Sequence, residues 1–325
     1  MMASDSTPDQ TELQINSFDK AIETLSCLPS NHHNLKHWNL WCTETFSSES
    51  WQTQLSESMA IAYARMALRN GVLSKKPRSY HNESHINDLL LRIMYCAERD
   101  TNQLNNEGLA VLCLFAACHD LRQAEPLKTD TDDSLVGANE AASYQEAVRI
   151  IELTTEGTKN STLWNPHNKL LLKTMIEGST FGSGGKRSKN FFQGNLAKHL
   201  LEQHNFTNQY DNELVLLACD LDTANVSLPI AEFAESAIDI YDELVSHQKA
   251  KISAHYFFCQ QQLIYFFEQQ SFHAKITQQW FQPHKDYNSE NLMALSKHIS
   301  SLPEDLPDSE IKLAFRIKAH ELQNL

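Results

Sequence analysis

The feature that most constrains the fold is one long apolar run, Gly108-Leu-Ala-Val-Leu-Cys-Leu-Phe-Ala-Ala-Cys118, which leads directly into His119-Asp120-Leu121. It contains no charged residue, no proline and no glycine after the first position. Such a run predicts a buried helix rather than a strand. Burying His119 and Asp120 at its end costs free energy unless something pairs with them. Because imidazole and carboxylate both bind metals, the pair favours a divalent cation; a helix that ends at a solvated pair is the alternative.

The composition of the chain favours an all-helical fold. Of 325 residues, 41% are hydrophobic and 21% charged, and only 9 are glycine and 9 proline, too few for a turn-rich β architecture. The net charge is -14, from 27 Lys and Arg against 41 Asp and Glu, which argues against general nucleic-acid binding and against binding to anionic membranes. An anionic substrate would need a local basic cluster or a bound metal.

The cysteines and the N-terminal sequence indicate which cellular compartment to expect. Seven cysteines in no regular spacing are typical of reduced thiols. The first ten residues lack the basic start and apolar core of a signal peptide, and no apolar run is long enough to cross a bilayer. These features predict a cytoplasmic protein with no membrane partner, and they leave the oligomeric state open.

Polarity and breaker residues divide the chain into four parts. We expect a disordered tail over residues 1–14, N-terminal helices that pack on the core over 15–75, the core itself over 76–225, and a C-terminal helical extension over 226–325, also packed on the core. Individual helices are expected over residues 15–28, 50–68, 82–99, 139–153 and 169–179, from 213 onward, and after Pro303 and Pro307.

Further metal-binding or acidic side chains lie near the predicted helix ends. Asn82 opens one helix, and His81 and His85 share a face if its first turn is helical. Asp220 follows a second apolar run, so it repeats the arrangement at His119-Asp120. Glu140, near another helix start, is either complementary to the helix dipole or part of a site.

The segment Phe181–Asn190 gathers three glycines and three cations, among them Lys186 and Arg187. Flexible glycines beside cations can close over a phosphate, although a solvated loop has the same composition. The spacing does not match the phosphate-binding loop of nucleotide-hydrolysing folds.

Taken in order, these motifs resemble the HD superfamily of metal-dependent phosphohydrolases, which is named for a His…His-Asp…Asp ligand set. Arg78-x-Tyr80-His81-Asn82-x-x-His85 is similar to the signature of cyclic-nucleotide phosphodiesterases and of small bacterial HD hydrolases, and Ala218-Cys-Asp220-Leu221 to the phosphodiesterase segment with the last ligand. Asn139-Glu140-x-x-Ser143 and Thr180 resemble features of the bacterial group. The resemblance covers roughly residues 76–225.

The resemblance implies an HD-type helical bundle with additional N- and C-terminal helices, whose core is catalytic. It implies one divalent ion (Mn, Fe, Co, Ni, Zn or Mg), with a second ion left open, held by the ligands His85, His119, Asp120 and Asp220. It also implies that His81 protonates the leaving oxygen. Asp120 and Glu140 are further catalytic candidates, and the candidates for substrate contact are Arg78, Tyr80, Asn82, Lys186 and Arg187.

The expected function is metal-dependent hydrolysis of a phosphate mono- or diester, of a nucleotide or cyclic nucleotide, by metal-activated water. Phosphodiesterases carry a further histidine shortly after His-Asp, where this chain has Leu121-Arg122-Gln123. Two alternatives stay open. One is a catalytically inactive nucleotide sensor or partner-binding protein, and the other is a di-iron oxygenase that would recruit Glu140 or His167.

Overall fold

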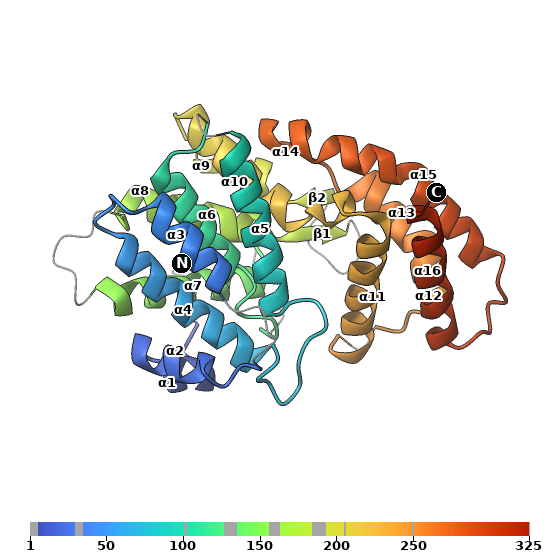
Figure 1. Ribbon diagram of the computed structural model, residues 1–325, viewed down its shortest axis with the longest axis horizontal. Helices are drawn as coiled ribbons and strands as arrows, with labels where there is room; N and C mark the ends of the chain where they lie inside the picture. The colour runs from blue at the N-terminus through green and yellow to red at the C-terminus, as the bar shows by residue number, and fades with distance from the viewer. Residues whose placement is uncertain are drawn as a thin grey trace. The chain divides into compact units, whose positions relative to one another are not determined.

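The computed structural model describes residues 6–29, 35–100, 103–126, 135–155, 163–183, 193–204, 206–248 and 250–324. The protein is predominantly α-helical, which confirms the expected all-α class; the described residues contain a single two-stranded sheet. The chain divides into two compact units (Figure 1). The first comprises Met1–Phe181 and Asn195–Leu221, and the second comprises Gly182–Gly194 and Asp222–Leu325.

The helices that begin in the first unit are α1 (Gln10–Gln14), α2 (Phe18–Leu25), α3 (Lys36–Thr45), α4 (Gln52–Arg69), α5 (Glu83–Arg99), α6 (Asn106–Cys118), α7 (Ala138–Thr155), α8 (Pro166–Gly178), α9 (Ala197–His204) and α10 (Gln209–Asp222). Strands β1 (Phe181–Ser183) and β2 (Gln193–Asn195) pair with each other. The helices expected from the sequence over residues 50–68, 82–99, 139–153 and 169–179 correspond to α4, α5, α7 and α8, with small differences at the ends.

Helix α6 forms the centre of the first unit. Every residue from Gly108 to Cys118 is buried, and α4, α5, α7 and α8 all pack against it. Asn105 caps its N-terminus by accepting a hydrogen bond from the Gly108 amide at 2.8 Å. The prediction of a buried helix is confirmed. Because α6 is covered by other helices, the residues that follow Cys118 emerge inside the unit.

The expectation of a disordered tail over residues 1–14 is wrong for the described part of that segment. Asp9 caps α1, and Glu12 within it is only 4% exposed. The Glu12 carboxylate binds Arg149 through two bonds of 2.7 and 2.8 Å, and it binds Arg122 at 3.0 Å. Two-pronged guanidinium–carboxylate pairs are strong when buried, so the polar segment is held in place by charges far away in the sequence.

These contacts belong to a larger set that we term the arginine–carboxylate cluster. Its members are Arg65, Arg69, Arg122, Arg149, Asp9, Glu12 and Glu146. Arg65 is 2% exposed and lies 3.2 Å from Glu146, while Arg69 binds both oxygens of Asp9 at 2.8 Å. The cluster joins α1, α4 and α7 around charges that are supplied entirely by the chain.

Helix α5 begins with two side chains that fix its position. Asn82 caps the helix by accepting from the Ser84 amide at 2.8 Å. Glu83 is 1% exposed and accepts from the Val72 amide at 2.8 Å. Its carboxylate lies against the Cα of Gly71, where an added Cβ would meet a carboxylate oxygen at 1.4 Å. The loop after α4 and the start of α5 are therefore locked together.

The second unit contains η1 (Ala224–Ser227), α11 (Ile230–Ser246), α12 (Ala254–Tyr256), η2 (Phe257–Gln261), α13 (Gln262–Ile264), η3 (Tyr265–Gln269), α14 (Lys275–Trp280), α15 (Gln282–Ser300) and α16 (Asp308–Gln323). Its core is aromatic: Phe258 stacks on Phe315 with ring centroids 4.4 Å apart, and Tyr241 contacts Phe258. The final helix begins directly after Pro307, as the sequence predicts.

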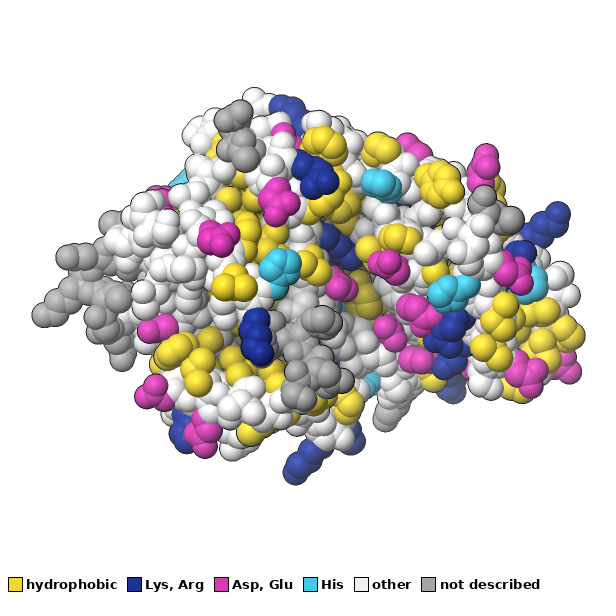
Figure 2. All heavy atoms as spheres, in the orientation of Figure 1, with side chains coloured by type: hydrophobic (Ala, Val, Ile, Leu, Met, Phe, Trp, Pro, Cys, Tyr) yellow, Lys and Arg dark blue, Asp and Glu magenta, His cyan; other side chains and the backbone are white. Residues whose placement is uncertain are grey.

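Helices α11 and α16 also meet through ion pairs. Glu235 binds Arg316, and Asp242 binds Lys312 at 2.7 Å. Figure 2 shows acidic and basic side chains next to each other over these two helices. Throughout the part of the chain that the structure describes, every helix is too short or too polar to cross a membrane.

Candidate metal centre

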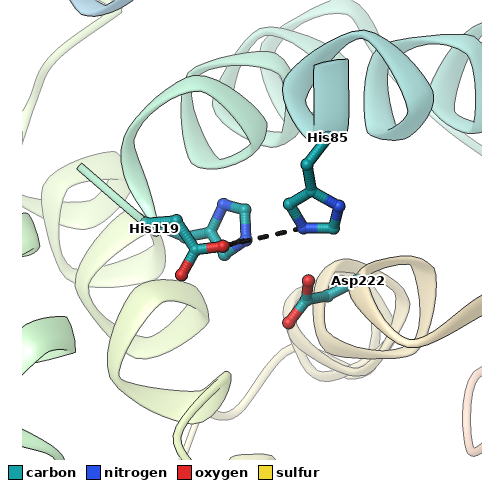
Figure 3. A group of neighbouring side chains, drawn as sticks. His85, His119 and Asp222 are labelled. Atoms are coloured by element: carbon teal, nitrogen blue, oxygen red, sulfur yellow. Dashed lines mark ion pairs between the residues drawn. The ribbon is translucent and has the colours of Figure 1, made fainter. Parts of the chain in front are cut away.

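One group of side chains in the described residues has the composition and spacing of a metal site. His85, His119, Asp120 and Asp222 each offer one ligand atom, and these atoms all lie within 4.8 Å of one another. We term them the histidine–aspartate group. Nitrogen and oxygen ligands about 2.1 Å from one ion lie up to roughly 4.2 Å apart, so little movement is needed to share an ion. Figure 3 shows His85, His119 and Asp222 pointing toward a common point.

His85 comes from the first turn of α5 and is 3% exposed. Its Nε2 lies 3.6 Å from Oδ2 of Asp120. The ring of Tyr80 packs against the His85 ring with centroids 4.8 Å apart, and the His119 ring lies at 5.4 Å. Aromatic neighbours on both sides restrict the rotation of the imidazole, so Nε2 stays directed at the carboxylate.

His119 is the residue directly after α6 and is 1% exposed. Its Nδ1 lies 3.3 Å from the carbonyl oxygen of Ala116, an acceptor, so that contact favours the proton on Nδ1 and leaves a lone pair on Nε2. Nε2 lies 2.9 Å from Oδ2 of Asp120. A lone pair and a carboxylate at this distance repel each other unless a cation or a further proton lies between them. A ring with Nδ1 on a backbone carbonyl and Nε2 toward the ion is a common metal-ligand arrangement.

Asp120 is 9% exposed and presents its two oxygens to different partners. Oδ1 accepts a hydrogen bond of 2.6 Å from Nε2 of Gln123, three residues further on. Oδ2 faces the histidines, with the Nε2 atoms of His119, His85 and His81 at 2.9, 3.6 and 4.0 Å. One oxygen is therefore available to an ion while the other is held.

The fourth member is Asp222, whereas the sequence pattern assigned the fourth ligand to Asp220. Both lie in the last turn of α10, and the Leu221 carbonyl between them accepts a 2.7 Å hydrogen bond from Arg92 of α5. Residues two apart on a helix point to different sides. Asp220 is fully buried and is not one of the four residues that converge. Two acids in Cys219-Asp220-Leu221-Asp222 could have signalled this ambiguity in the sequence.

His81 lies just before the N-cap of α5 rather than within the helix. Its side chain is 29% exposed, and its Nε2 is 4.0 Å from Oδ2 of Asp120. The Tyr80 ring packs edge-on against it with centroids 5.0 Å apart. His81 therefore stands at the more accessible side of the group, beside the same carboxylate oxygen that His85 and His119 face.

Two candidates for substrate contact have local structural roles. Arg78 donates from Nη2 to the Gln123 carbonyl at 2.9 Å. Asn82 caps α5 and donates from Nδ2 to the carbonyls of Arg78 and Ser79 at 2.9 and 3.0 Å. These contacts fold the loop before α5 around the histidine–aspartate group. Sequence reasoning also missed Gln123, which lies after the end of α6 in a segment without helical structure.

The remaining candidates are not among the four converging residues or lie outside the described residues. Glu140 lies in the first turn of α7, with its carboxylate against Gly137. His167, considered as a ligand for a second iron, is 54% exposed and lies 3.4 Å from Asp211. Lys186 and Arg187 lie outside the described residues, so the role of the glycine-rich basic segment stays a prediction.

The cysteines do not add thiolate ligands to the group. All seven are free, as the sequence suggests. Cys118 immediately precedes His119, and burial raises the pKa of its thiol far above the ordinary value. A neutral buried thiol is a poor metal ligand. The available donor set is thus two imidazoles and two carboxylates, which suits a hard or borderline divalent ion.

Comparisons with known proteins do not identify a family for this chain. No protein-family model matches the chain, and no curated protein matches it either.

Proposed function

We propose that the protein binds one divalent metal ion through His85, His119, Asp120 and Asp222. The observation that carries the proposal is the convergence of these four ligand atoms within 4.8 Å, at the ends of α5, α6 and α10. The donor set suits Mn, Fe, Co, Ni, Zn or Mg. Within the described residues this is the one group of its kind, which favours a single ion over a di-iron site.

We further propose that the bound ion serves hydrolysis of a phosphate mono- or diester, with a nucleotide as the substrate class. The order His85, His119-Asp120, then an acid late in α10 supports this through its resemblance to HD phosphohydrolases. When bound, such an ion supplies Lewis-acid stabilisation of the charge that develops on phosphorus and lowers the pKa of water.

The chain's own residues have distinct parts in this proposal. Asp120 and Asp222 would neutralise the charge of a bound ion and orient a water, and the partly exposed His81, 4.0 Å from Asp120, would give a proton to the departing alkoxide. A sensor that binds a nucleotide without turnover would need the same ion but not this proton. Loss of turnover with retained nucleotide binding in His81→Ala therefore supports the enzyme over the sensor.

The experiment is metal analysis of the purified protein, followed by a screen of phosphate mono- and diesters with each candidate ion. We expect about one equivalent of metal per chain and metal-dependent hydrolysis, both lost in His119→Ala. A wild-type protein that takes up none of the candidate ions, or a His119→Ala variant that binds them equally well, contradicts the proposal.

A further inference from the structure

The two oxygens of Asp120 have different partners, because Gln123 binds only one of them. Nε2 of Gln123 donates to Oδ1 at 2.6 Å, while Oδ2 faces His85 and His119. An ionised carboxylate only accepts hydrogen bonds, so the amide nitrogen must be the group that faces it. We propose that Gln123 is the positioning residue of the metal centre, which rests on the proposed function: it fixes Asp120 as a ligand through Oδ2 alone.

Gln123 can do this because its own backbone is anchored. Its carbonyl accepts from Nη2 of Arg78 at 2.9 Å. The amide of Arg122 donates to the Ser143 hydroxyl at 3.0 Å, and the Leu121 carbonyl accepts from Nη1 of Arg69 at 2.8 Å. Each of the three residues after Asp120 is thus tied to a different part of the unit. The glutamine side chain reaches Asp120 from a fixed origin rather than from a flexible loop.

This arrangement has a consequence for the ion. With Oδ1 occupied by the amide, Asp120 contributes one oxygen and leaves a coordination position open for water or a phosphate oxygen. Without the amide, Oδ1 loses this hydrogen bond and becomes available as a second ligand atom, so that the carboxylate could chelate an ion through both oxygens. Loss of a hydrogen bond to a metal ligand typically lowers metal affinity about 10–100-fold.

The test compares Mn²⁺ binding to full-length wild type and Gln123→Ala by titration calorimetry. We expect the variant to bind about 10–100-fold more weakly. The matched control is Gln103→Ala. Gln103 donates to Oδ1 of Asp100 at 2.9 Å with the same three-residue spacing, but on an exposed surface. The control should bind Mn²⁺ with wild-type affinity.

A second readout separates positioning from a general loss of structure. Absorption of bound Co²⁺ reports coordination number, and Gln123→Ala should show a weaker, higher-coordinate spectrum as Oδ1 of Asp120 becomes a ligand. Gln123→Glu, which keeps the shape but places a second carboxylate against Oδ1, should weaken binding at least as much.

The outcomes are distinguishable. A wild type that binds neither Mn²⁺ nor Co²⁺ overturns the proposed function and this inference with it. A wild type that binds both, with Gln123→Ala and Gln123→Glu unchanged in affinity and spectrum, overturns the positioning role alone.

Discussion

Two groups of ionisable side chains solve the same electrostatic problem differently. In the arginine–carboxylate cluster the chain supplies both signs, and guanidinium groups bind carboxylates through several short hydrogen bonds. In the histidine–aspartate group, imidazole nitrogens and carboxylate oxygens converge on one another. A divalent cation is the natural complement of such a donor set. The first group therefore serves the fold, and the second is suited to chemistry.

The two groups also touch through the main chain. Arg69 binds Asp9 within the cluster and, with its Nη1, the carbonyl of Leu121 next to Asp120. Arg122 likewise binds Glu12 and follows Leu121 in sequence. The difference between the groups thus yields a clear expectation: damage to the cluster should reduce stability with or without metal, and damage to the histidine–aspartate group should reduce only the stability that metal adds.

The largest effect is expected from Arg65→Ala. Arg65 is 2% exposed and contacts Glu12 and Glu146 at 3.4 and 3.2 Å, so its loss leaves buried carboxylates without that charge. Breaking a buried pair from one side costs about 3–5 kcal/mol. Urea denaturation with and without Mn²⁺ measures this, and the increment from metal should be unchanged. The control is Lys20→Ala, whose pair with Glu23 is exposed and should contribute nothing measurable. A loss no larger than the control's would show that the cluster does not stabilise the fold.

The second prediction concerns which acid of α10 the ion uses. At a metal concentration a hundredfold above Kd, binding to the native state alone adds about 2.7 kcal/mol of stability. We expect Asp222→Asn to reduce this increment by about 1.4 kcal/mol or more, a tenfold loss of affinity. Asp220→Asn should leave this increment unchanged, because Asp220 is not one of the four residues that converge. The measurement is the shift of the denaturation midpoint with added Mn²⁺, and a larger loss of the increment in Asp220→Asn would restore the ligand set expected from the sequence.

The contrast between Asp220 and Asp222 shows how much of the site can be predicted from the sequence. The unbroken apolar run predicted α6 and its burial, because few structures other than a buried helix accommodate such a run. The run also drew attention to His119 and Asp120 at its end, while the spacing of His81 and His85 and the resemblance to HD phosphohydrolases pointed to His85. The structure places His85, His119 and Asp120 together. Asp220 and Asp222 differ only in the side of α10 on which they lie, and that depends on how the helix is rotated in its packing, which composition does not encode.

The prediction of disorder for the N-terminal segment was wrong for a related reason. Residues 6–14 are polar, and local composition alone predicts disorder. Their order comes from Arg65, Arg122 and Arg149, which are more than fifty residues away and reach Glu12 only in the folded chain. Gln123 was missed for a different reason: its importance is a single contact to Asp120, three residues before it, in a segment that is not helical. Neither long-range ion pairs nor hydrogen bonds from neighbouring residues to metal ligands produce a periodic pattern in the sequence.

The smallest effect is expected from Asp9→Asn, which tests the link between the two groups. Burial alone would raise the pKa of Asp9, but the hydrogen bond and charge of Arg69 outweigh it, so the pKa lies below its ordinary value of 3.8. A carboxyl whose pKa is lowered by folding stabilises the native state above its unfolded pKa, and this contribution is lost as the pH falls through the folded pKa. Because the Asp9 side chain is 31% exposed, we expect about 1 kcal/mol or less at pH 7. Wild type and Asp9→Asn should therefore differ in urea denaturation at pH 7, and the difference should shrink as the pH falls below the ordinary Asp pKa of 3.8 and through the lowered pKa of the folded state. Arg69 keeps its bond to the Leu121 carbonyl in this variant, so Mn²⁺ affinity should stay within a few-fold of wild type. A tenfold loss of affinity would mean instead that α1 controls the metal centre through Arg69, and the two groups would then be one functional system.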